Sequence, residues 1–126
     1  LVYCDPLPVG ELTAAISESL ECMRICGIHT SVASFCTGAF PSNMLIAAYE
    51  QFESVVEESF DTLSYINVSV SSEKKSLILR LMLKTDCFTY ESENKRKEYK
   101  GFSCKTAITK EEQDIHVAFV FEEGGA

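Results

Sequence analysis

A long amphipathic stretch at residues 41–63 constrains this chain most, because its apolar side must be covered by another layer. Apolar residues recur there at intervals of three and four: Leu45, Ala48, Phe52, Val55, Val56, Phe60 and Leu63. This spacing predicts a long helix, and Pro41 suits its first turn. Acidic residues follow the opposite side: Glu50, Glu53, Glu57 and Asp61. They predict an acidic ridge that faces away from the core.

Two pairs of segments after this helix predict two β-hairpins. Apolar residues alternate with Asn and Ser over residues 65–71, and leucines fill every second position of residues 77–83. Residues 101–109 and 114–121 form a second pair around a polar turn. Alternation places the apolar side chains of a strand on one face, so each pair is expected to form a hairpin. Residues 86–100 break the pattern and predict a loop, with room for one helical turn.

The first 40 residues predict one further helix and one strand. The helix is indicated by apolar residues three and four apart that end before Gly27: Leu12, Ile16, Leu20 and Met23. Residues 28–35 are rich in β-branched side chains and predict a strand. Two apolar helix faces need one face of a sheet to cover them. The expected fold is an α+β two-layer sandwich, with helices on one face of a mixed, mostly antiparallel sheet.

The length and charge of the chain limit its organisation and its partners. We expect residues 1–126 to be one domain, with residues 1–40 as a lead-in and residues 41–126 as the core. A net charge of -8 repels phosphate backbones and anionic lipids, which argues against nucleic acid and membrane surfaces as partners. No apolar run reaches the length of a membrane span. Because the chain begins with Leu1, we expect further sequence upstream.

The six cysteines predict neither a disulfide framework nor a metal site. They are Cys4, Cys22, Cys26, Cys36, Cys87 and Cys104. Their density is below that of a disulfide scaffold, and no CxxC spacing occurs. Cys22 and Cys26 are spaced to share a helix face, but neither histidine stands at ligand spacing to them. Buried reduced thiols are therefore expected.

Three segments together resemble the ATP-binding domain of sensor histidine kinases and its wider ATPase superfamily. They are the helix segment 52–59, the hairpin 66–83 and the closing Phe119-Val120-Phe121-Glu122-Glu123-Gly124-Gly125-Ala126. Residues 19–28 look like the helix and strand that lead into such domains. The resemblance implies a domain that positions ATP and Mg²⁺ so that a histidine of another domain attacks the γ-phosphate.

The resemblance also gives the long helix a role in metal binding. In the family an acidic or polar residue precedes, by four positions, an asparagine that holds Mg²⁺ beneath the triphosphate. Glu53 matches the first position, which implies a catalytic role, and Glu57 stands in place of the asparagine as the metal ligand. A carboxylate can bind Mg²⁺ but adds negative charge near the phosphates. A hydrated acidic helix face is the alternative reading of both residues.

The loop after the second hairpin strand departs from the family pattern. The family places there an aspartate that reads adenine, followed by glycines, and Asp86 occupies a comparable position. No glycine lies between Asp86 and Gly101, so the amide nest that cradles phosphate is missing. Four basic residues are the candidate phosphate contacts: Lys95, Arg96, Lys97 and Lys100. A solvated basic turn is the alternative.

Three functions stay open at this point. The first is a cytoplasmic ATP-binding domain of a bacterial two-component kinase whose parent protein is membrane-anchored. Its partners would be an upstream phosphoacceptor domain and a response regulator. The second is a pseudo-ATPase that serves as a dimerisation or docking module, and the missing glycines favour it. The third is an unrelated ligand-binding sandwich. His29 and His116 lie in strand patterns without an acidic neighbour, so neither is a phosphoacceptor candidate.

Overall fold

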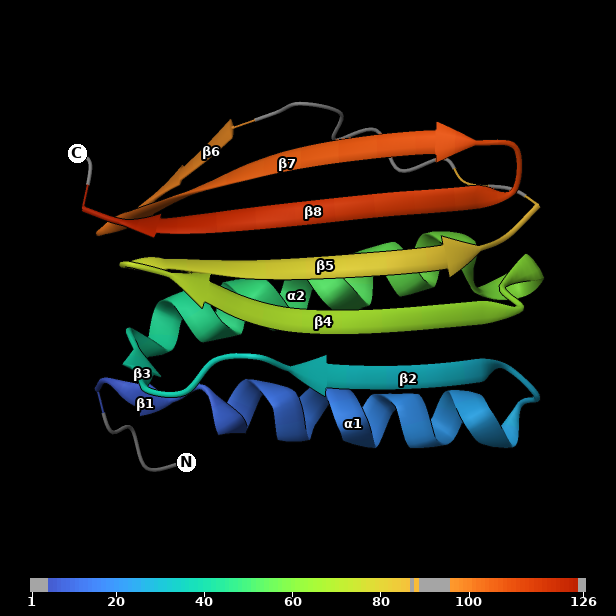
Figure 1. The fold of residues 1–126 in the computed structure, drawn as a ribbon, viewed down its shortest axis with the longest axis horizontal. Helices are drawn as coiled ribbons and strands as arrows, with labels where there is room; N and C mark the ends of the chain where they lie inside the picture. Colours follow the sequence, from blue (N-terminus) through green and yellow to red (C-terminus); the bar gives the residue numbers. More distant parts are fainter. Residues whose placement is uncertain (1–4, 87, 89–95, 125–126) are drawn as a thin grey trace.

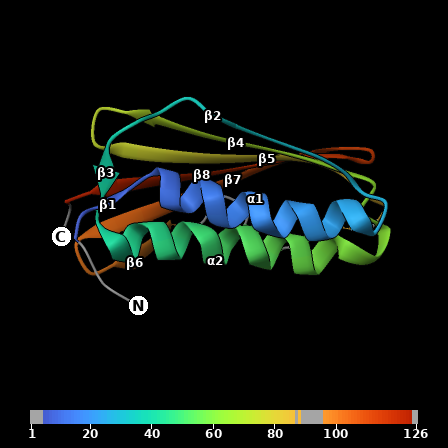
Figure 2. The same ribbon diagram turned by 90° about the horizontal axis from the view of Figure 1, so that it is seen from below.

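In the computed structural model, two helices cover one face of a six-stranded sheet, as Figures 1 and 2 show. The structure describes residues 5–86, 88 and 96–124. The helices are α1 (Gly10–Ile25) and α2 (Ser42–Ser59), and a short 3-10 helix, η1 (Phe60–Thr62), follows α2. The strands are β1 (Leu7–Pro8), β2 (His29–Ser34), β3 (Ala39–Phe40), β4 (Tyr65–Glu73), β5 (Ser76–Lys84), β6 (Arg96–Tyr99), β7 (Phe102–Glu111) and β8 (Asp114–Glu123).

The large sheet has the order β2-β4-β5-β8-β7-β6. Only β2 and β4 run parallel, and the other neighbours are antiparallel, so the predicted mixed, mostly antiparallel sandwich is confirmed. β1 and β3 form a separate two-stranded sheet beside the helix ends. In the described part of the chain, neither helix combines the length and apolar character that a membrane span requires.

The core forms where the inward faces of the central strands meet the helices. Val68 of β4, Leu81 of β5 and Val117 of β8 are neighbours in register and are fully buried. Phe52 of α2 belongs to the same buried cluster and is 1% exposed. Burial of apolar surface of this kind contributes about 25 cal/mol per Å². The predicted alternation in the hairpins and the predicted stripe on α2 are therefore the two halves of one core.

The end of the long helix differs from the prediction. α2 ends at Ser59, and Phe60 begins the 3-10 turn. A 3-10 turn has fewer residues per turn than an α-helix, so it rotates the following side chains away from the apolar stripe. Phe60 is consequently 40% exposed, although its position in the stripe predicted burial. Leu63, after the turn, is buried as expected.

The segment between the hairpins contains a strand that the sequence did not predict. Residues 96–99 form β6, which pairs antiparallel with β7, so the prediction of a loop with a helical turn is wrong there. β6 is an edge strand, and Arg96, Lys97 and Glu98 are all exposed. A four-residue strand in which only Tyr99 is partly buried shows no alternation of apolar residues, which explains why no signal was visible.

The described cysteines differ in how far they are buried. Cys22, Cys26, Cys36 and Cys104 are free thiols, as predicted, whereas Cys4 and Cys87 lie outside the described residues. Among the described cysteines, Cys104 is buried and Cys36 is half-buried, whereas Cys22 and Cys26, at the C-terminal end of α1, are exposed. The expectation of burial is therefore wrong for these two. Burial raises the pKa of Cys104 to about 11, opposed by a hydrogen bond with Thr106 and by the charge of Lys97.

Candidate functional site

The long helix α2 is the element around which the candidate site is built, and its two flanks have different neighbours. One flank faces α1, and the two helices lie side by side on the sheet (Figure 2). The other flank faces the edge of the sheet that carries β6, where Gln51 reaches Tyr99. The side chains on these two flanks of α2 therefore lie in different environments.

The flank that faces β6 is closed by direct side-chain contacts. The Gln51 amide donates a hydrogen bond of 3.4 Å to the Tyr99 hydroxyl. The Tyr99 ring stacks on Phe102, with centroids 4.5 Å apart and planes 8° from parallel. About two helical turns nearer the N-terminus of α2, the Asn43 amide donates a hydrogen bond of 3.1 Å to the Lys100 carbonyl. These contacts bring the β6–β7 turn against α2.

The C-terminal end of α2 is joined to the end of β5. The Ser59 hydroxyl donates to the Val55 carbonyl at 2.9 Å within the helix. Thr85, the residue before Asp86, is buried and its hydroxyl shares a short hydrogen bond with Thr62. It also reaches the Ser59 carbonyl at 3.5 Å. The chain that leads to Asp86 is therefore anchored on the helix by polar contacts.

Asp86 itself is exposed and already has a partner. Its carboxylate accepts a hydrogen bond from the Gln113 side chain in the β7–β8 turn. The Thr85 amide donates to the Gln113 carbonyl at 3.1 Å, so the two segments are held by two contacts. Phe88, two residues further on, packs against the hydrophobic core. The aspartate that was expected to read adenine is thus part of the connection between β5 and the last hairpin.

The flank that faces α1 is open and forms what we call the α1–α2 groove. Its floor is apolar and consists of Leu12, Met23, Leu45, Tyr49, Phe52 and Val56. Its rim carries four exposed carboxylates: Glu11, Glu50, Glu53 and Glu57. The Ser19 and Tyr49 hydroxyls are 2.6 Å apart and join the two helices across the floor.

The described residues among the predicted site residues lie on different elements. Glu53 and Glu57 line the α1–α2 groove, on the flank away from β6. Asp86 lies at the end of β5, and Lys95 is outside the described residues. Within residues 5–86, 88 and 96–124, no three His, Cys, Asp or Glu side chains are grouped closely enough to hold a metal ion.

The basic residues of β6 are engaged locally. Arg96 forms an ion pair with Glu98 at 2.7 Å and donates to the Ser103 hydroxyl at 3.3 Å. The Lys97 ammonium lies 5.1 Å from the centroid of the Tyr99 ring. Lys100 is exposed in the β6–β7 turn, where Asn43 binds its carbonyl oxygen. The Arg96 and Lys97 side chains therefore contact groups of β6 and β7, whereas Glu53 lines the α1–α2 groove.

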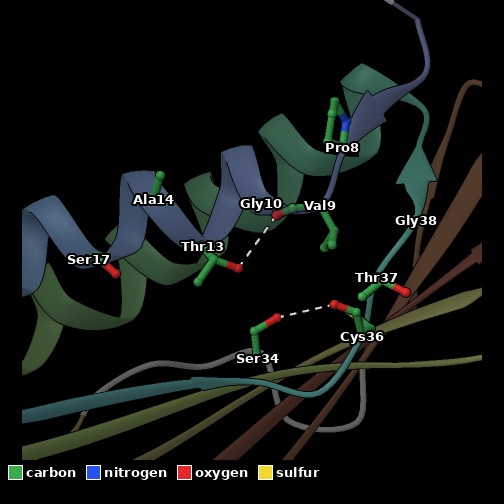
Figure 3. A pocket seen from close by; sticks show the side chains of 10 residues that line it. All are labelled: Pro8, Val9, Gly10, Thr13, Ala14, Ser17, Ser34, Cys36, Thr37 and Gly38. Atoms are coloured by element: carbon green, nitrogen blue, oxygen red, sulfur yellow. Dashed lines mark hydrogen bonds between the residues drawn. The ribbon is translucent and has the colours of Figure 1, made fainter.

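A second hollow lies between the start of α1 and the connection from β2 to β3 (Figure 3). Within it, the Thr13 hydroxyl donates to the Val9 carbonyl at 3.5 Å, and the Ser34 hydroxyl donates to the Cys36 carbonyl at 3.4 Å. None of its lining side chains is charged. The described lining of this hollow contains none of the predicted site residues and no acidic or basic side chain, so this hollow is not the candidate functional site.

Sequence reasoning missed the groove, although two signals for it were present. Ile46 falls outside the core stripe of α2 and is 47% exposed at the groove. Cys22 likewise lies beside the apolar stripe of α1 and lines the groove. An apolar residue beside the buried stripe of a helix widens the apolar face of that helix. Widened apolar faces on two neighbouring helices indicate an apolar surface that both helices form together.

Comparisons with known proteins identify the fold. No family model and no curated protein matches the chain. The catalytic domain of histidine kinase ThkA superimposes with a TM-score of 0.66 at 10% identity, covering 97% of this chain and 98% of that domain. Histidine kinase AdeS of Acinetobacter baumannii gives a TM-score of 0.64 at 6% identity, covering 99% of this chain and 70% of that one.

A third similar structure is that of ThkA in complex with the response regulator protein TrrA. It matches with a TM-score of 0.51 at 10% identity and covers 92% of this chain and 39% of that one. All three matches run through the sheet and both helices, because each covers more than nine tenths of the chain. The chain therefore has the fold of histidine kinase catalytic domains.

Proposed function

We propose that the chain is the ATPase-like domain of a histidine-kinase-type signalling protein and that it acts through protein contacts, with nucleotide binding lost. The observation that carries this proposal is the closed flank of α2. Nucleotide would have to lie between the long helix and the segment after β5. Tyr99, Phe102 and Gln51 occupy the β6 side of that helix with direct contacts.

The chemistry of the remaining candidates supports the same proposal. A phosphate cradle needs backbone amides that approach closely, and residues 87–100 contain no glycine to permit this. The Asp86 carboxylate accepts a hydrogen bond from Gln113, so an adenine amino group would have to share this carboxylate with that contact. Glu53 and Glu57 lie on the flank that faces α1. A ligand that needs all three groups at once would have to span the helix.

The second candidate function is binding of ATP and Mg²⁺, which the match along nearly the whole ThkA catalytic domain favours. Glu57 would then hold the metal ion, and Glu53 would assist at the reacting phosphate. Asp86 would read adenine. Phosphate oxygens would be contacted by basic side chains of residues 95–100: Lys95, Arg96, Lys97 and Lys100. A histidine of an upstream domain would accept the phosphoryl group.

Titration calorimetry of the chain with ATP, with and without MgCl₂, separates these two functions. We expect no saturable heat at millimolar nucleotide. Mg²⁺-dependent heat that disappears in Glu57→Ala and in Asp86→Asn would refute loss of nucleotide binding. Glu50→Ala is the matched control, because it removes a carboxylate from the same helix at a position that the resemblance gives no role in metal binding.

The proposed role in a signalling protein also implies which proteins this chain binds. We propose a cytoplasmic domain that contacts an upstream phosphoacceptor-type domain of its own protein and a response regulator, and that forms a homodimer. Support for the regulator comes from ThkA, which has been solved in complex with the response regulator protein TrrA. Size-exclusion chromatography with light scattering, with and without a purified regulator, measures both associations.

A further inference from the structure

The α1–α2 groove is a preformed apolar surface on the outside of the helical layer. Two adjoining hollows of about 400 Å³ and 210 Å³ share Glu53 as a common wall. Their floor is built partly from core residues, because Leu12, Leu45 and Phe52 are no more than 4% exposed. The Ser19–Tyr49 hydrogen bond of 2.6 Å joins the helices between them. A partner would therefore meet this shape without prior rearrangement of the helices.

The rim of the groove has one sign of charge. Glu11, Glu50, Glu53 and Glu57 line it, and none of the described residues that line the two hollows is Lys or Arg. The α2 sequence contains no basic residue, and the one basic residue of α1, Arg24, is paired with Glu21 at 3.2 Å. None of the four rim carboxylates has an ion-pair partner in the described part of the chain. Their charge is available to a partner.

The combination of charge and apolar floor excludes several occupants. Nucleic acid and anionic lipid are repelled by the rim carboxylates. A second copy of the chain, related by a two-fold axis, would place the same carboxylates against each other. The groove also has a large apolar surface, made of the floor residues and of Ile46, which is 47% exposed beside the rim. A small cation would make no use of this apolar surface. The occupant must carry both apolar and basic groups.

We propose that the α1–α2 groove binds an amphipathic helix of a partner protein whose apolar stripe is flanked by Lys or Arg. Glu50, Glu53 and Glu57 are three and four residues apart, which places them about 4.5 and 6 Å apart along the axis. A helix laid in the groove repeats the same spacing and can offer one cation to each carboxylate. The proposal rests on the proposed function insofar as it names the partner class of a protein-contact module.

The test uses a labelled synthetic peptide of about 18 residues, with leucines on one helical face and lysines flanking them. Its binding to the chain is followed by fluorescence anisotropy. The triple variant Glu50→Lys/Glu53→Lys/Glu57→Lys is expected to weaken binding at least about tenfold, because three attractive pairs become repulsive. Ile46→Ser is expected to weaken it about threefold or more by removing apolar contact.

A matched triple variant controls for overall charge. Glu73→Lys/Glu122→Lys/Glu123→Lys changes the net charge equally at exposed positions of β4 and β8. It is expected to change affinity less than about threefold. Equal losses in both triple variants, or equal binding of a scrambled peptide, would overturn the proposal by showing non-specific attraction. If circular dichroism shows that the groove variant is unfolded, Glu53→Gln and Ile46→Ser carry the test, and unchanged binding in both overturns it.

Failure of this proposal is distinguishable from failure of the proposed function. Peptide that does not bind, with no ATP binding in the calorimeter, overturns the groove assignment alone. Peptide that binds in the groove, together with Mg²⁺-dependent ATP binding, overturns the loss of nucleotide function and leaves the groove assignment standing.

Discussion

Replacement of Tyr99 tests whether the flank of α2 that faces β6 is closed by packing. In Tyr99→Ala the stack on Phe102 and the hydrogen bond with Gln51 are both lost. In Tyr99→Phe only the hydrogen bond is lost. The pair of variants therefore separates the contribution of the ring from that of the hydroxyl.

The size of each effect follows from the contacts. Stacked aromatic pairs contribute about 0.5–1.5 kcal/mol beyond area burial. A net hydrogen bond contributes about 0.5–1.5 kcal/mol. Tyr99 also packs against the core cluster and is only partly buried, so the lost apolar contact is smaller than for a full core aromatic. We expect Tyr99→Ala to lower the free energy of unfolding by about 2–3 kcal/mol and Tyr99→Phe by about 0.5–1 kcal/mol.

Urea unfolding followed by far-UV circular dichroism measures both values. With a slope of about 1.5 kcal/mol per molar urea, Tyr99→Ala should lower the midpoint by about 1.3–2 M. A Tyr99→Ala protein as stable as the original would show that the ring fills no enclosed space, and the closed flank would be refuted. Equal losses in both variants would show that the hydroxyl, and not the ring, holds β6 against α2.

Three further results are expected. Gly101→Ala should lower the free energy of unfolding, measured in urea, by about 1 kcal/mol or more, because Gly101 has φ +89, which alanine adopts only with strain. An added methyl group would meet no neighbour there, so the loss reports the backbone strain alone. Gly10→Ala, which starts α1 with similar open space, should instead raise stability by about 0.5 kcal/mol. Near pH 8, iodoacetamide should modify exposed Cys22 quickly and buried Cys104 slowly, as mass spectrometry of digests would report. The Cys104 rate should rise only as the pH approaches its raised pKa of about 11, and fast modification near pH 8 would contradict its burial.

The parts of the fold that bury one face were predictable from sequence. Helical periodicity predicts that residues of α2 such as Phe52 and Val55 face the core, and both are buried. The same holds for the alternation of Val68 and Leu81 in the first hairpin. β6 was not predictable, because Arg96, Lys97 and Glu98 are all exposed and pairing with β7 uses backbone groups that every residue has.

The location of a site around α2 was predictable only in part. Periodicity shows that Glu53 and Glu57 share one side of the helix, but it does not state which neighbouring element that side faces. The answer depends on where α1 and β6 pack, which are long-range contacts. Because α1 lies on the side of Glu53, the two carboxylates line the α1–α2 groove, and Gln51 takes the side of Tyr99.

A ¹⁵N–¹H correlation spectrum of the chain, titrated first with ATP and MgCl₂ and then with the leucine–lysine peptide, tests the use of the two flanks of α2 most directly. We expect no saturable shifts with nucleotide at Asn43, Gln51, Thr85 or Asp86. With peptide, saturable shifts should be confined to residues of the α1–α2 groove, such as Glu53. Nucleotide-dependent shifts along the β6 side of α2 and at Asp86 would contradict the account.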